Sequence, residues 1–150
     1  MNWDALGATG EIVGALAVLL TLVYLATQIK QSNDISRFNA SKEIMNQFNE
    51  INRLVATDSS IRHLLMKSGE LSVDEREQLY NFSMMFCNIW QTIQNAYDSG
   101  QVDVEFYAVG KKDVLVEVDR WPNFRSAVED WLSNYPEFSD LEIFRPLRDA

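Results

Sequence analysis

A run of 18 uncharged residues, 12–29, is the strongest constraint on how this chain can fold. Only Thr21, Thr27 and Gln28 within it are clearly polar. At about 1.5 Å per residue a helix of this length covers about 27 Å, close to the roughly 30 Å hydrocarbon core of a bilayer. The alternative is a fully buried core helix, but the run is long for that role. We therefore expect an N-terminal transmembrane helix over residues 1–30.

The two flanks of this run differ in charge. Two acids and no basic residue precede it, whereas Lys30, Arg37 and Lys42 follow it. Positively charged segments are retained in the cytoplasm, and a cleavable signal peptide would begin with a basic region. We expect the N-terminus to lie outside and residues 31–150 to form a cytoplasmic domain.

The composition excludes several classes of function. A formal net charge of −9 disfavours nucleic acid as a partner. The single cysteine, Cys87, permits no intramolecular disulfide, and the single histidine, His63, permits no His-rich metal cluster. We expect Cys87 to be an inert core thiol and His63 to be a surface or capping residue. No cofactor, metal or catalytic group is expected.

Helical periodicity continues after residue 30. The clearest helix is opened by the capping box Ser72-x-x-Glu75 and stopped by Gly100. We expect its apolar line to form the core: Leu79, Phe82, Phe86, Ile89, Ile93 and Ala96. Further helices are expected over residues 35–55, from Asp58 or Ser59 through Lys67, from Asp103 onward, from Pro122 to a boundary at Pro136, and over 138–144 with a stop at Pro146.

We make more specific predictions for two segments, residues 35–55 and 113–118. Residues 35–55 continue the membrane helix without Gly or Pro, and their inner face is expected to contain Phe38, Ile44, Met45, Phe48, Ile51, Leu54 and Val55. The β-branched residues of 113–118 favour a strand, but the length and surroundings of the segment favour a helix. We interpret it as helix. The predicted fold is all-α, with a single transmembrane helix followed by a small cytoplasmic helical bundle.

Four segments resemble a widespread group of uncharacterised bacterial proteins: NWDALGATGEIVGALAVLLTLVYLATQIKQ, LSVDEREQLYNF, YDSGQVDVEFY and WPNFRSAVEDW. Members of this group share a membrane helix that opens NWD…GEIVG and a helical cytoplasmic domain. The resemblance implies an all-helical protein of the bacterial inner membrane. It transfers no activity, and residues 121–125 lack the glycine of the group's last motif.

Small residues recur along one face of the predicted membrane helix. Gly7, Gly10, Gly14, Ala17 and Thr21, here called the small-residue seam, follow one another at alternating steps of three and four. Helices in lipid associate through close backbone contact, which small residues permit. We expect the seam to mediate homo-oligomerisation or packing against the helix of a membrane-protein partner.

Three functions fit this pattern. The first is a non-enzymatic single-pass membrane protein that self-associates and carries a cytoplasmic sensing or docking domain. The second is an accessory or adaptor subunit of a larger membrane complex. The third is a ligand-gated pore or effector, because an assembly would gather copies of Glu11 at its outer end. Lys111, Lys112, Arg120 and Arg125 are the candidate contacts for a small anion.

Overall fold

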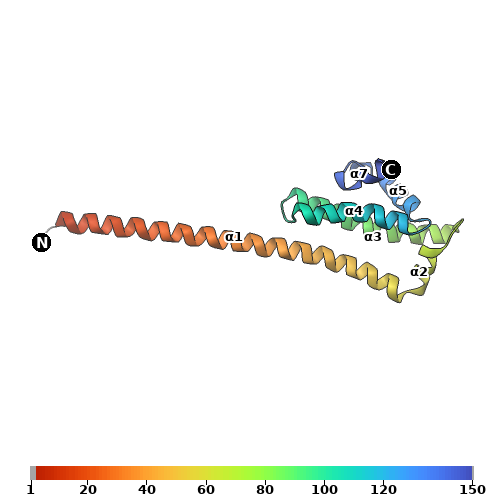
Figure 1. The fold of residues 1–150 in the computed structure, drawn as a ribbon, viewed down its shortest axis with the longest axis horizontal. Coiled ribbons are helices and arrows are strands. Elements are labelled where there is room, and N and C mark those ends of the chain that lie inside the picture. Colours follow the sequence, from red (N-terminus) through yellow and green to blue (C-terminus); the bar gives the residue numbers. More distant parts are fainter. Residues whose placement is uncertain (1–2, 150) are drawn as a thin grey trace. The chain divides into compact units, whose positions relative to one another are not determined.

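The computed structural model describes residues 3–149, and every regular element in that range is a helix. Residues 1, 2 and 150 of the predicted ranges lie outside the described part. The elements are α1 (Trp3–Thr57), α2 (Ser59–Met66), α3 (Val73–Asp98), α4 (Val104–Arg120), α5 (Phe124–Asn134), α6 (Pro136–Ser139), the 3-10 helix η1 (Glu142–Phe144) and α7 (Arg145–Arg148) (Figure 1). The all-α prediction is confirmed: a long apolar N-terminal helix precedes a bundle of shorter helices.

The chain forms two compact units, Met1–Arg37 and Phe38–Ala150. The first unit is the N-terminal part of α1. This helix has no break between the apolar run and Thr57, so the predicted continuity is confirmed. The boundary between the units at residue 37 does not end the helix, because α1 continues through it to Thr57.

Three helices of the second unit begin at the predicted caps. The Asp58 side chain caps α2, and the Asp103 carboxylate caps α4 by accepting from the backbone N–H of Phe106 at 2.7 Å. At the start of α3 the Ser72 hydroxyl accepts from the Glu75 N–H, and the Glu75 carboxylate accepts from the Ser72 N–H. These contacts satisfy backbone donors that a helix leaves unpaired in its first turn.

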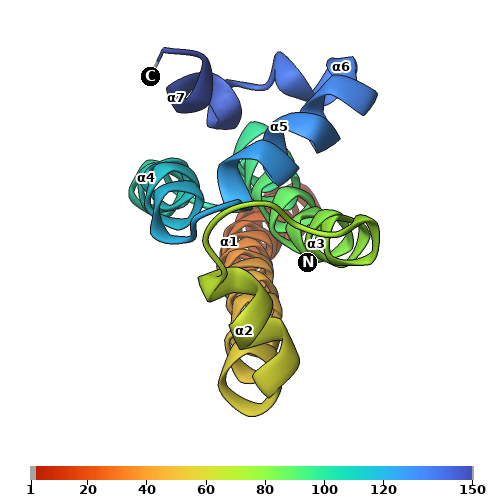
Figure 2. The same ribbon diagram turned by 90° about the vertical axis from the view of Figure 1, so that its right-hand side faces the viewer.

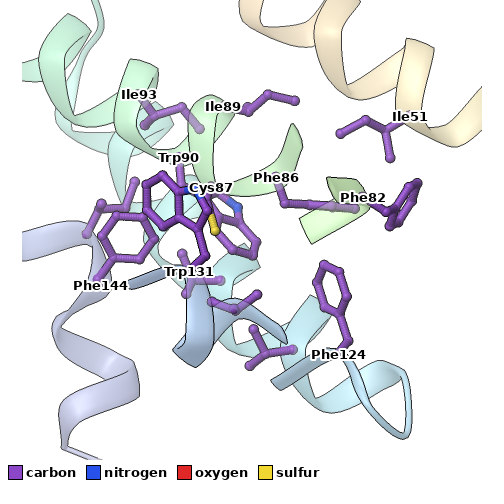
Figure 3. Packing of buried hydrophobic residues seen from close by; sticks show 14 of the residues in the cluster. Ile51, Phe82, Phe86, Cys87, Ile89, Trp90, Ile93, Phe124, Trp131 and Phe144 are labelled. Atoms are coloured by element: carbon purple, nitrogen blue, oxygen red, sulfur yellow. The ribbon is translucent and has the colours of Figure 1, made fainter. Parts of the chain in front are cut away.

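The core of the second unit is built on α3. The ring of Phe86 lies 5.7 Å from Phe82, 5.5 Å from Trp90 and 5.2 Å from Phe124, measured between ring centroids (Figure 3). Helices α4 and α5 pack against α3, while η1 and α7 pack against α4 (Figure 2). The expected core line is confirmed, since all of its members are buried: Leu79, Phe82, Phe86, Ile89, Ile93 and Ala96.

Residues 113–118 are helical, within α4. Val114 and Val118 are buried one turn apart, whereas Val116 faces solvent. The helical spacing thus places two β-branched residues in the core, and packing overrides their strand preference. A Cβ added to Gly110 would lie 2.9 Å from Cδ1 of Ile93, so the glycine lets α4 approach α3 closely.

Two expectations about prolines near the C-terminus are wrong. Pro122 lies in a turn ahead of α5 and not in its first turn. Pro146 does not stop a helix but lies in the first turn of α7, where the missing N–H is not needed. The single helix expected over 138–144 is divided between α6, which Pro136 opens, and η1.

The inner face expected for residues 35–55 is only partly right. Ile44 and Ile51 are buried, but Phe38 is 67% exposed and Met45 is 48% exposed. At 3.6 residues per turn Phe38 lies about 120° or more around the helix from the buried pair. The buried face of residues 35–55 therefore does not include Phe38, at the N-terminal end of the segment.

Candidate functional site

The apolar run of α1 is exposed throughout. Leu20, for example, is 71% exposed, and no residue of the most apolar 18-residue window is buried. A fully buried core helix, the alternative to a membrane span, is therefore not what the structure shows. The helix is long and apolar enough to cross a membrane by length and composition.

Every member of the small-residue seam is exposed on α1. Among the described atoms, a Cβ added to Gly7, Gly10 or Gly14 would meet nothing within 4 Å. The Thr21 hydroxyl donates to the Ala17 carbonyl at 2.9 Å, so its hydrogen bond is made within the helix, as lipid requires. Packing within the described part of the chain does not explain why these positions are small.

The four basic residues predicted to contact an anion lie on α4 and at the start of α5, but acids surround them. Lys112 is exposed. The other three pair with carboxylates: Lys111 with Glu142 at 2.8 Å, Arg120 with Glu117 at 3.2 Å and Arg125 with Asp119 at 2.6 Å. This pairing does not favour an anion site, and the contact stays a prediction.

A groove lies between α1, α3 and α4 of the second unit. It encloses a cavity of about 230 Å³ and an adjoining one of about 170 Å³, and both are lined by Asn52, Phe86 and Glu117. The larger cavity has apolar walls from all three helices: Met45 and Phe48, Phe86 and Ile93, and Phe106 and Val109. Phe106, Gly110, Asp113 and Glu117 follow at steps of four, three and four, so α4 presents one face to the groove.

Two carboxylates lie in this apolar setting. Asp113 is partly buried and accepts a hydrogen bond from the Trp90 indole N–H at 3.0 Å. Burial raises the pKa of Asp113, and the neighbouring charge of Glu117 adds to the effect. The Glu117 side chain is 13% exposed and pairs with Arg120, which also lies over the Trp121 ring. Asp113 has no ion pair among the described residues.

The groove was missed at the level of sequence. The four-residue spacing of Asp113 and Glu117 places both carboxylates on one face of the helix predicted for 113–118, but it does not identify the helices that pack against that face. The approach of α4 to α3 at Gly110 depends on contacts between segments far apart in the chain.

A second unforeseen feature is a buried polar cluster around Gln94, which is 5% exposed. Its carbonyl oxygen accepts from the Tyr107 hydroxyl at 2.7 Å and from the Ile143 backbone N–H at 3.0 Å. Its amide nitrogen donates to both carboxylate oxygens of Asp98 at 3.0 Å. The cluster joins α3, α4 and η1 and has a structural role.

The expectations for the two residues with reactive side chains are confirmed. Cys87 is fully buried, and burial raises the pKa of its thiol well above the ordinary value. A thiol kept protonated in the core is inert. His63 is exposed on α2.

Comparisons with family models, with curated proteins and with solved structures give no match to this chain. The resemblance to the bacterial membrane-anchored group stays a prediction.

Proposed function

We propose that this protein is a non-enzymatic, single-pass membrane protein that self-associates through α1 and carries a helical sensing or docking domain. The observation behind the proposal is the apolar surface of residues 12–29, which no part of the described chain covers. Water disfavours an exposed apolar surface of this extent, whereas the hydrocarbon of a bilayer matches it.

The proposed location is the bacterial inner membrane, with the N-terminus outside and the second unit in the cytoplasm. Charge supports this orientation, because Lys30 and Arg37 follow the span while only acids precede it. The resemblance described above supports the bacterial source.

Self-association is supported by the seam and by its continuation. The spacing of three and four residues continues from Thr21 through Tyr24, Gln28 and Gln31 to Ile35. Ile35 is an exposed apolar residue between polar neighbours. A line with this 3.5-residue period is typical of helices that pack with a left-handed supercoil. The proposed occupant of this face is a second copy of α1.

Crosslinking in native membranes tests the proposal. Leucine in place of Ala17 or Gly14 is expected to separate the helix backbones and remove the crosslinked oligomer. Ala15→Leu is the matched control, because Ala15 lies off the seam, about 100° around the helix from Gly14 and about 160° from Ala17. The measurement is the mass of the crosslinked species, followed by the mass of the gently solubilised protein.

Other outcomes would contradict the proposal. Oligomers that persist in Ala17→Leu and Gly14→Leu would show that the seam does not mediate self-association. A monomer that co-purifies with a different membrane protein would support the accessory-subunit function instead. Recovery of the intact chain in the soluble fraction would contradict membrane anchoring altogether.

A further inference from the structure

We propose that the groove between α1, α3 and α4 binds a small organic ammonium ion, with its apolar body against the phenylalanine walls and its nitrogen at Asp113. The inference rests on the proposed function in one respect, because it names a ligand class for the sensing domain. The groove itself is formed only by residues of the second unit.

The larger cavity is lined by acidic side chains and by no basic side chain of the described residues. The carboxylates of Asp113 and Glu117 both line the larger cavity, and no lysine or arginine of the described chain lines it. Arg120 lines only the adjoining smaller cavity, where it pairs with Glu117 at 3.2 Å. One negative charge, that of Asp113, is left without a cationic partner, so the groove complements a monocation.

The contacts of Asp113 within the fold do not require its carboxylate to be charged. The Trp90 N–H needs an acceptor, and a neutral amide oxygen can also accept it. Partial burial opposes ionisation of Asp113, as the raised pKa of the carboxyl shows. A bound cation would supply the compensation that the protein lacks.

The walls select an organic cation over a metal ion. Calcium and magnesium require six or more oxygen ligands, and the groove offers few oxygens among mainly apolar side chains. Phe48, Phe86 and Phe106 bring one aromatic ring from each helix. Aromatic rings attract alkylated ammonium groups, and the Asp113 carboxylate adds Coulombic attraction for the same cation.

Size limits the ligand further. The larger cavity, about 230 Å³, is smaller than the roughly 300–1,000 Å³ of pockets that hold drug-sized molecules. The ligand class is therefore an amine with a single ring or a short alkyl chain.

Phenethylamine is a suitable probe, and phenethyl alcohol is its uncharged counterpart of the same shape. Binding of each is measured by calorimetry on the full chain in phosphatidylcholine nanodiscs, with empty nanodiscs subtracted. We expect saturable binding of the amine and an affinity for the alcohol at least about tenfold lower, because the alcohol forms no charge-assisted hydrogen bond with Asp113.

Three variants identify the site. Asp113→Asn keeps an acceptor for Trp90 and is expected to reduce amine affinity to that of the alcohol, while alcohol binding is unchanged. Val109→Trp adds bulk at a wall residue that is 70% exposed, and it is expected to block both probes without disturbing the core. Glu105→Gln, at an exposed position of α4, is the control and is expected to bind both probes normally.

Equal affinity for the two probes, unchanged amine binding in Asp113→Asn, or no saturable amine binding by the full chain would each overturn the inference. None of these results bears on anchoring or self-association, because fractionation measures anchoring and crosslinking of the seam measures self-association.

Discussion

Asp113 is the residue at which folding and the proposed binding function make opposite demands. Its carboxylate is partly buried, receives one hydrogen bond from a neutral indole and lies near the like charge of Glu117, while Arg120 compensates only weakly. The resulting rise in pKa means that the folded state holds the proton more tightly than the unfolded chain does.

Replacing Asp113 by asparagine should therefore stabilise the fold at neutral pH. A group with a raised folded pKa contributes stability below its unfolded pKa and loses it as pH rises through the folded value. The free energy of unfolding of Asp113→Asn should exceed that of the parent at pH 7, and the difference should vanish below about pH 4. Thermal unfolding across this range, with Glu105→Gln as the control, measures the effect. A variant less stable than the parent at pH 7 would contradict it.

Gln94 is the residue on which the buried polar cluster depends. Gln94→Ala leaves the Tyr107 hydroxyl and the Ile143 N–H without their acceptor in the core. Each unsatisfied buried group costs about 1–3 kcal/mol, so we expect a loss of at least about 2 kcal/mol in the free energy of unfolding. Denaturant unfolding measures it. Asn95→Ala, at the exposed neighbouring position, should remain close to the parent.

At the scale of elements, the start of α3 combines a helix cap with an ion pair. The Glu75 carboxylate accepts from the Lys67 ammonium at 2.7 Å and from the Ser72 N–H at 2.8 Å, and these contacts lower its pKa to about 2. The cap is therefore also a link between the end of α2 and the beginning of α3.

This link predicts a specific acid sensitivity. A lowered folded pKa contributes stability above the unfolded value of 4.5 and loses it as pH falls toward about 2. Glu75→Gln should therefore be less stable than the parent at pH 7, with the two converging as pH falls through that window. Glu77→Gln, in the same turn but outside the capping box, is the control for thermal unfolding. A constant difference down to pH 2 would contradict the assignment.

The elements also show which features could be predicted from sequence. The boundaries of α2, α3 and α4 depend on local signals, such as the caps at Asp58 and Ser72 and the stop at Gly100, whose φ is +70°. The groove and the Gln94 cluster depend on contacts between distant segments, which periodicity does not encode. Gln94 in particular resembles any other polar helix residue until Tyr107 and Ile143 are placed beside it.

Across the whole molecule, basic residues are concentrated next to the apolar run and acidic residues farther along the chain. Residues 30–67 carry six basic and four acidic side chains, whereas residues 70–150 carry seven basic and sixteen acidic ones. Positive charge next to the apolar run favours cytoplasmic retention of that flank, and negative charge farther along should be repelled by anionic lipid. The proposed topology is thus a property of the whole sequence.

Cysteine labelling tests this topology. Asn2→Cys should react with a membrane-impermeant maleimide on intact spheroplasts, because the acidic flank is predicted to lie outside. Asp149→Cys should react only after lysis. The native Cys87 does not interfere, because it is fully buried and its thiol stays protonated; the parent protein is therefore the unlabelled control. Labelling of position 149 alone on intact spheroplasts would show the opposite orientation. Labelling of both positions would show that residues 31–150 do not lie in the cytoplasm.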